Sequence, residues 1–163
     1  MIDTETRALA ERVLNACRAR GRKLATAESC TGGLVAGALT EIAGSSDVVD
    51  RGFVTYSNAA KMAMLGVPEA TLAAHGAVSQ PTAEAMAKGA LERAGVDLTV
   101  AITGVAGPGG GSAEKPVGLV HFAAAAHDGR LRHRERRFGD VGRADVRRLS
   151  VIEALSLLME LAA

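Results

Sequence analysis

The sequence of 163 residues has very few aromatic side chains, with no tryptophan, one tyrosine and three phenylalanines. So few rings cannot form a platform on which nucleic-acid bases stack. Charge of one sign is also lacking, because 19 lysines and arginines stand against 18 aspartates and glutamates and leave a formal net charge of +1. A balanced surface has no broad field for nucleic acid or for an anionic membrane. The sequence therefore predicts neither as a partner.

Cysteines and long apolar runs are scarce as well. Cys17 and Cys30 are the only cysteines, too few for a disulfide framework, and such usage is typical of a reducing compartment. No run reaches the roughly 18 apolar residues of a membrane span, and the N-terminal segment has no apolar signal core. We therefore expect a cytoplasmic protein. The four histidines are dispersed and have no metal-ligand spacing, so no metal is expected either.

Apolar periodicity and turn residues predict an alternation of helices and strands. The predicted helices cover residues 4–20 (capped by Thr4), 32–43, a stretch from 58 through 64, 81–94 and 142–162. The predicted strands cover residues 23–27, 48–56, 97–105, 117–126 and 131–138. Strand and helix alternate first, and a hairpin around residues 127–129 ends the sheet. This order predicts a single α/β domain, a three-layer α/β/α sandwich with a mixed, mostly parallel sheet.

The first candidate site is the segment Glu28-Ser29-Cys30-Thr31-Gly32-Gly33, at a predicted strand-to-helix turn. Open α/β sheets bind ligands at this edge, and N–H groups at the start of a helix can receive an oxyanion or a phosphate. Two glycines let a substrate approach the backbone closely. The alternative is that Ser29 or Thr31 only caps the helix. Cys30 could be a nucleophile, but a cysteine in an apolar turn is more often a small buried hydrophobe.

A nucleophilic serine needs a base, and a lysine is the best candidate. Lys61 is one of only four lysines and lies among small and apolar neighbours in NAAKMAM. Burial lowers the pKa of a lysine, and a neutral amine can accept the proton of a hydroxyl. The alternative is a Lys61 that extends along an amphipathic helix to solvent. Tyr56, the only tyrosine, could orient a proton, or it could be a half-buried strand residue.

A glycine-rich segment, TGVAGPGGGS at residues 103–112, follows the predicted strand 97–105. It lacks the lysine and the following helix of a P-loop, and it is no dinucleotide fingerprint for the same reason. Glycines at this density suggest a backbone that approaches a ligand, and a flexible connection is the alternative.

Two arginines at the start of the last predicted helix indicate an anionic ligand. Arg143 and Arg147 are four residues apart and share a helix face. The two positive charges repel each other and interact unfavourably with the positive end of the helix dipole, and each effect costs roughly a few tenths of a kcal/mol. Asp140 and Asp145 could offset this cost, but a bound phosphate would offset it better. The alternating arginines of the last predicted strand we interpret as structural charges that protect a sheet edge from aggregation. They are Arg130, Arg132, Arg134 and Arg136.

Several motifs together resemble one family. TAESCTGG, RGFVTYSNAAK, HGAVS, AITGVAGPGGG, KPVG and the late Arg-x-x-x-Arg occur in the order found in the C-terminal domain of the competence/damage-inducible protein CinA. The resemblance runs from about residue 5 to the end of the chain. This domain also occurs alone as the bacterial nicotinamide mononucleotide amidase. The family fold is a three-layer α/β/α sandwich with a mixed sheet.

The resemblance implies hydrolysis of the carboxamide of nicotinamide mononucleotide to nicotinate mononucleotide and ammonia, a step of pyridine nucleotide salvage. It assigns Ser29 as the nucleophile, Lys61 as the base and Tyr56 as an assisting residue. Thr103 and Arg143 belong to the same site, and Arg147 is the alternative for the phosphate. We expect the backbone of Cys30, Thr31, Gly32 and Gly33 to stabilise the oxyanion, and the glycine loop to help hold the phosphate through Gly107, Gly109 and Gly110. No cofactor is required.

Two other functions stay open at this point. A nucleotide-binding or regulatory module without turnover would keep the glycine loops and arginines but would need no lysine of lowered pKa. An amidase with another substrate is also open, because nothing in the sequence directly recognises a pyridine ring. The small-residue helix 32–43 and the last helix leave room for a homodimer or a higher homo-oligomer.

Overall fold

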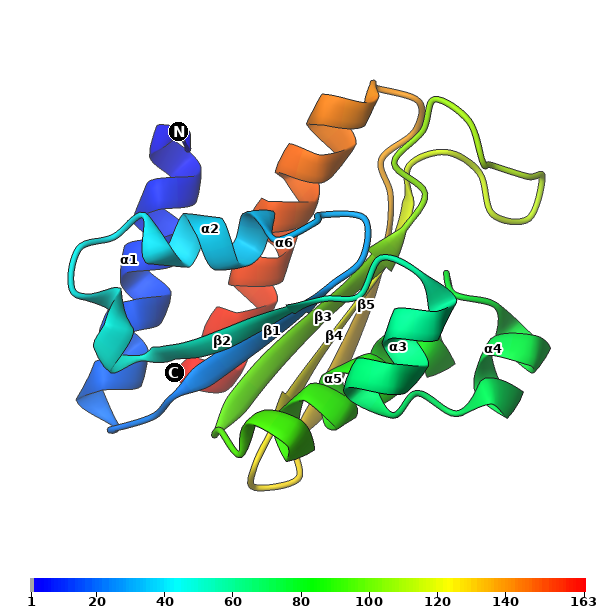
Figure 1. The fold of residues 1–163 in the computed structure, drawn as a ribbon. Coiled ribbons are helices and arrows are strands. Elements are labelled where there is room, and N and C mark those ends of the chain that lie inside the picture. Colours follow the sequence, from blue (N-terminus) through cyan, green and yellow to red (C-terminus); the bar gives the residue numbers. More distant parts are fainter. Residues whose placement is uncertain (1) are drawn as a thin grey trace.

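The computed structural model describes residues 2–163 and places a five-stranded sheet between two groups of helices (Figure 1). The strands are β1 (Leu24–Glu28), β2 (Val49–Val54), β3 (Leu98–Gly104), β4 (Leu119–Ala126) and β5 (Leu131–Arg137). The helices are α1 (Thr4–Ala19), α2 (Leu34–Thr40), α3 (Asn58–Leu65), α4 (Glu69–His75), α5 (Gln80–Ala94) and α6 (Arg143–Ala162), with a short 3-10 helix η1 at Ser45–Asp47. None of these helices within residues 2–163 has the length and apolarity to cross a membrane.

The strand order is β2-β1-β3-β4-β5. β1 pairs in parallel with both β2 and β3, whereas β4 is antiparallel to β3 and to β5. Only β4 therefore runs against the other strands, and the predicted mixed, mostly parallel sheet is confirmed. The predicted arginine-rich edge is confirmed as well, since β5 closes the sheet and Arg134 and Arg136 pair with Glu153 of α6.

Two apolar clusters fill the spaces on either side of the sheet. One joins α1, α2 and α6 to the sheet face that carries Val100, Ile102 and Phe122. The other joins α3 and α5 to the opposite face, which carries the smaller Ala101 and Ala123. Figure 1 shows the same division, with α1, α2 and α6 on one side of the strands and α3, α4 and α5 on the other. The predicted three-layer sandwich is confirmed.

Three local predictions need correction. The helix predicted over 32–43 is shorter, because Gly32 and Gly33 adopt positive φ angles of 56° and 100° and delay α2 until Leu34. The cap of α1 is Asp3, not Thr4, since the Asp3 carboxylate accepts the N–H of Thr6. Helix α4 was not predicted; it follows the end of α3, where Gly66 adopts a φ of 66°.

Candidate functional site

The ends of β1, β2 and β3 bring three chain segments to one edge of the sheet. The Ser29 N–H donates to the Ile102 carbonyl of β3 at 2.9 Å, and the Thr55 N–H donates to the Glu28 carbonyl of β1 at 2.9 Å. These bonds continue the parallel ladders by one residue beyond each strand. Because parallel strands end at the same edge, Ser29, Tyr56 and Thr103 lie where open α/β sheets bind ligands.

Lys61 reaches this edge from α3. The helix begins after Ser57, whose hydroxyl accepts the Ala60 N–H at 3.0 Å, and Lys61 is its fourth residue. The Lys61 amine lies 2.9 Å from Ser29 Oγ, donates to the Thr55 carbonyl at 2.9 Å and lies 3.5 Å from the Tyr56 carbonyl. The side chain is only 1% exposed, so the alternative of a lysine that extends to solvent is wrong.

Burial lowers the pKa of the Lys61 amine below its ordinary value. No carboxylate of residues 2–163 lies within ion-pair distance of the amine to offset that burial. A neutral amine has two N–H donors and one lone pair. Carbonyl oxygens can only accept, so the Thr55 and Tyr56 carbonyls take the N–H groups. In this neutral form the lone pair is left for the Ser29 hydroxyl, which is the arrangement that a general base and its nucleophile require.

Tyr56 and Arg143 meet beside the lysine. The Arg143 guanidinium donates to the Tyr56 hydroxyl at 3.0 Å and to the Gly107 carbonyl at 2.7 Å. Within residues 2–163 it has no carboxylate partner. Tyr56 is 62% exposed, so it is not the half-buried strand residue of the alternative interpretation. An uncompensated cation beside an exposed ring is suited to a phosphorylated ligand.

These groups line a cavity of about 230 Å³. Its lining residues are Ser29, Cys30, Tyr56, Asn58, Lys61, Ala77, Val78, Thr103, Gly104, Ala106 and Arg143. The Thr103 hydroxyl donates to the Ala77 carbonyl at 2.8 Å, which ties β3 to the segment before α5. Asn58 was not among the predicted site residues, although its place three residues before Lys61 on the same helix was a usable signal.

Cys30 lines the cavity too, but its thiol is an unsuitable nucleophile. Burial raises the pKa of this thiol to about 12, so the reactive thiolate is scarce at neutral pH. The side chain is only 5% exposed and belongs to the apolar cluster under α2 and α6. The structure therefore agrees with the small buried hydrophobe expected for a cysteine in such a turn.

Glu28 holds the turn after Ser29 through hydrogen bonds from its carboxylate. It was not among the predicted site residues. Its fully buried carboxylate accepts the Thr31 hydroxyl at 2.7 Å and the N–H groups of Val35 and Ala36 at 2.8 and 3.0 Å. Glu28 thus satisfies free donors at the start of α2. Neither Ser29 nor Thr31 caps the helix, so that alternative is wrong. A carboxylate directly before a turn into a helix was the available signal.

Several predicted binding residues lie outside the cavity lining. Arg147 donates to the Cys30 carbonyl at 3.1 Å instead of lining the cavity beside Arg143. Thr31 is fully buried, and Gly32 and Gly33 form the turn behind Ser29. Gly107 contributes only its carbonyl, to Arg143, while a Cβ at Gly109 or Gly110 would meet nothing within 4 Å. The structure does not bring the last two to the cavity.

No histidine is among the residues that line the cavity. His121 of β4 and His133 of β5 bind each other, with Nδ1 of the first 2.9 Å from Nε2 of the second. Residues 2–163 contain no cluster of three or more histidine, cysteine or acidic side chains placed to hold a metal ion. Lys61 is thus the candidate base that lies within hydrogen-bond distance of the Ser29 hydroxyl.

The sequence matches the family model described as the CinA C-terminal domain over residues 6–162. The chain belongs to this family. It is 53% identical to a protein from Escherichia coli (strain K12) named nicotinamide-nucleotide amidohydrolase PncC, over 98% of this chain and 96% of that protein. It is also 56% identical to a CinA-like protein from Synechococcus sp. (strain RCC307), of which it covers only 36%.

Solved structures of the family have the same fold. A competence/damage-inducible protein from Agrobacterium tumefaciens is 55% identical and superposes with a TM-score of 0.98, over 100% of this chain and 99% of that one. A CinA-superfamily protein from Klebsiella pneumoniae is 41% identical, with a TM-score of 0.91 over 96% and 97% of the two chains. The α/β fold described above is therefore the fold of the family.

Proposed function

We propose that this chain is an amidohydrolase that converts nicotinamide mononucleotide to nicotinate mononucleotide and ammonia, with Ser29 as the nucleophile and Lys61 as its base. One observation carries the proposal: a fully buried lysine, which has no ion-pair partner within residues 2–163, lies 2.9 Å from a serine hydroxyl in the lining of a cavity. The activity in the name of the Escherichia coli relative, which matches nearly the whole chain, supports the substrate class.

The first half-reaction forms an acyl-enzyme. Ser29 Oγ attacks the carboxamide carbon while the neutral Lys61 amine accepts the hydroxyl proton. The carboxamide oxygen becomes an oxyanion, for which the N–H groups of Cys30 and Thr31 are the nearest donors in sequence. The carbon–nitrogen bond then breaks, the Lys61 ammonium returns its proton to the leaving nitrogen, and ammonia departs.

The second half-reaction releases the acid. Water attacks the ester carbon of the acyl-enzyme, and Lys61 accepts a proton from that water. The bond to Ser29 Oγ breaks and the proton passes from Lys61 to Oγ. Nicotinate mononucleotide is released as the acid, which loses the second proton of the water to solvent and becomes a carboxylate. Both half-reactions use the same lysine in alternating roles, and neither requires a metal or an organic cofactor.

In the proposed complex Arg143 binds the 5′-phosphate. Its guanidinium is exposed at the cavity, has no carboxylate partner within residues 2–163 and is oriented by Tyr56 and the Gly107 carbonyl. A guanidinium can form two parallel hydrogen bonds with a phosphate. The Tyr56 ring, the exposed aromatic group of the cavity, offers a surface for the pyridine ring.

Ammonia release from nicotinamide mononucleotide tests the proposal with the wild type, Ser29→Ala and the surface control Lys88→Ala. We expect Ser29→Ala to lower kcat by more than about 10³-fold, because no oxygen nucleophile remains, while the variant still binds the nucleotide. Lys88 is exposed on α5, and its variant should match the wild type. Full activity in Ser29→Ala would refute the mechanism. A wild type that binds the nucleotide without turnover would indicate a binding module instead.

A further inference from the structure

Arg147 binds the backbone of the turn that carries the nucleophile. Its Nε donates to the Cys30 carbonyl at 3.1 Å, and its Nη2 lies 3.5 Å from the Thr31 carbonyl. Within residues 2–163 it forms no ion pair with a carboxylate. A guanidinium that could pair with an acid is therefore bound to two peptide carbonyls of a segment 117 positions earlier in the chain.

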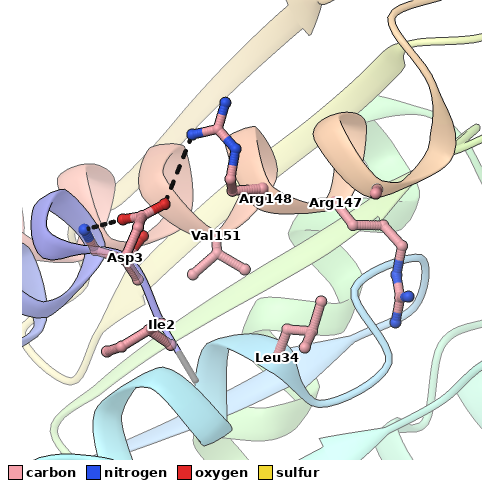
Figure 2. Close-up of a pocket in the computed structure, with 8 residues that line it drawn as sticks. Ile2, Asp3, Leu34, Arg147, Arg148 and Val151 are labelled. Carbon is pink, nitrogen blue, oxygen red and sulfur yellow. Dashed lines mark hydrogen bonds and ion pairs between the residues drawn. The ribbon is translucent and has the colours of Figure 1, made fainter.

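The neighbouring arginine on the same helix behaves differently. Arg148 lies 3.7 Å from the Asp3 carboxylate and 3.4 Å from that of Asp145. Figure 2 shows the two side chains leaving α6 in different directions, with Arg148 joined to Asp3 and Arg147 extending away from that pair. They border a hollow of about 380 Å³ between α1, α2 and α6, which contains neither Ser29 nor Lys61. Arg148 is thus a matched control for Arg147.

The hydrogen bonds to the Ser29 and Cys30 carbonyls set the orientation of two peptides in the turn, and so determine which N–H groups can bind a ligand. In a trans peptide the carbonyl and the N–H point in opposite directions. The Ser29 carbonyl accepts the Gly32 N–H at 3.0 Å, and the Cys30 carbonyl accepts Arg147. The N–H groups on the other side of these two peptides belong to Cys30 and Thr31, and neither donates a hydrogen bond within residues 2–163. Each free N–H thus belongs to a peptide whose carbonyl is bound.

We propose that Arg147 is a positioning residue, which holds the Cys30–Thr31 peptide so that the Thr31 N–H can receive the oxyanion formed on the substrate. The inference rests on the proposed function of Ser29. A charged donor on the carbonyl also polarises the peptide and strengthens its N–H as a donor. Glu28 binds the Thr31 hydroxyl at 2.7 Å, so Thr31 is held by both residues. Arg147 is then assigned to the oxyanion and Arg143 to the phosphate.

Steady-state kinetics with nicotinamide mononucleotide separate these roles in Arg147→Ala, Arg147→Lys and Arg148→Ala. Loss of one oxyanion donor costs about 10²–10³-fold in kcat, and we expect a misplaced donor to cost about 10–100-fold, with KM nearly unchanged. Arg147→Lys, or guanidinium ion added to Arg147→Ala, should restore part of kcat, and Arg148→Ala should match the wild type. A raised KM with unchanged kcat in Arg147→Ala would overturn the inference, because it would show a role in binding the phosphate.

A second measurement separates this inference from the choice of substrate. A fluorophosphonate probe phosphonylates an activated serine: the Ser29 oxygen bonds to phosphorus, Lys61 accepts the hydroxyl proton and fluoride leaves. In the transition state negative charge develops on the phosphoryl oxygen, which the same backbone donors can stabilise. Mass spectrometry should show Ser29 labelled about 10-fold or more slowly in Arg147→Ala than in the wild type or in Arg148→Ala. Labelling of a wild type that releases no ammonia would refute the substrate and leave the role of Arg147 standing. Equal labelling rates in all three proteins would overturn that role, and a wild type that is not labelled would overturn both proposals.

The Arg147→Lys variant guards against a folding defect. If circular dichroism shows that Arg147→Ala is unfolded, Arg147→Lys is used for the same kinetic and labelling measurements. Its single ammonium cannot reproduce the planar guanidinium that spans two carbonyls, so the positioning role should still be impaired. A folded Arg147→Lys with lowered kcat, unchanged KM and slower labelling supports the positioning role. A folded Arg147→Lys with wild-type kcat and labelling rate overturns it.

Discussion

Lys61→Met is expected to lower kcat/KM for nicotinamide mononucleotide by about 10²–10⁴-fold, the usual contribution of a general base. Methionine has nearly the length and volume of lysine, so it can fill the buried site between Ser29 and the Thr55 carbonyl. It has no lone pair that can accept the Ser29 proton at neutral pH. The loss should appear in kcat more than in KM, because the amine acts on the serine rather than on the nucleotide.

The same substitution should not destabilise the fold. Burial lowers the pKa of Lys61 in the folded state, whereas the unfolded chain keeps the ordinary lysine value of 10.5. The wild type therefore loses stability as the pH falls from 10.5 toward the lowered value, because the unfolded state takes up the proton first. Methionine removes this cost, although it also removes a donor from the Thr55 carbonyl. Thermal unfolding at pH 8 should give a Tm no lower than that of the wild type.

The surface variant Lys88→Met is the matched control for charge and composition. Lys88 lies on the exposed side of α5, and we expect wild-type activity from this variant. Activity retained in Lys61→Met would remove the lysine from the mechanism. If the stability of Lys61→Met falls with decreasing pH as steeply as that of the wild type, the buried Lys61 amine is not the source of this pH dependence.

Gly89→Ala is expected to be strongly destabilising. A Cβ at Gly89 of α5 would lie 1.9 Å from the backbone carbonyl oxygen of Leu65, at the end of α3. A backbone atom cannot rotate away, so the two helices must separate. Overpacking of this kind costs about 1–3 kcal/mol and occasionally more, and each kcal/mol lowers Tm by roughly 2–4 °C in a chain of this size. Since α3 carries Lys61, amide hydrolysis should fall as well.

Gly37→Ala is the matched substitution in another helix. Gly37 of α2 is exposed, has no positive φ and would place its Cβ with no atom within 4 Å. Replacing glycine by alanine inside a helix stabilises it by about 0.5–1 kcal/mol. Thermal unfolding should therefore give shifts of opposite sign for the two variants. A Gly89→Ala protein as stable as Gly37→Ala would contradict the close packing of α3 on α5.

Part of the site could be predicted because its signal is local. Ser29 was singled out by a turn between an apolar strand and a small-residue helix, and Lys61 by the apolar residues around it. These local features determine where the two residues lie in the fold, since the end of a strand places the serine at the sheet edge and apolar neighbours bury the lysine. The order of helices and strands was likewise enough to predict the three-layer arrangement.

The remainder of the site depends on side-chain directions that one sequence does not encode. Glu28 and Arg147 are charged residues of ordinary appearance, and their contacts with the turn exist only because β1, α2 and α6 converge there. The spacing of Arg143 and Arg147 suggested one anion site with two arginines. In the structure the two arginines have different contacts: Arg143 lines the cavity, whereas Arg147 binds the Cys30 carbonyl in the turn after Ser29.

The proposed mechanism depends on the protonation state of Lys61, which can be measured directly by NMR titration of lysine side chains labelled with carbon-13 at Cε. Lys61→Met assigns the Lys61 signal by its disappearance, and the exposed Lys88 serves as the internal reference. We predict that the Lys61 signal titrates at a pH below the ordinary 10.5, because burial disfavours the charged amine. A Lys61 titration at or above the ordinary 10.5 would contradict the proposed mechanism, because a charged amine cannot accept the Ser29 proton.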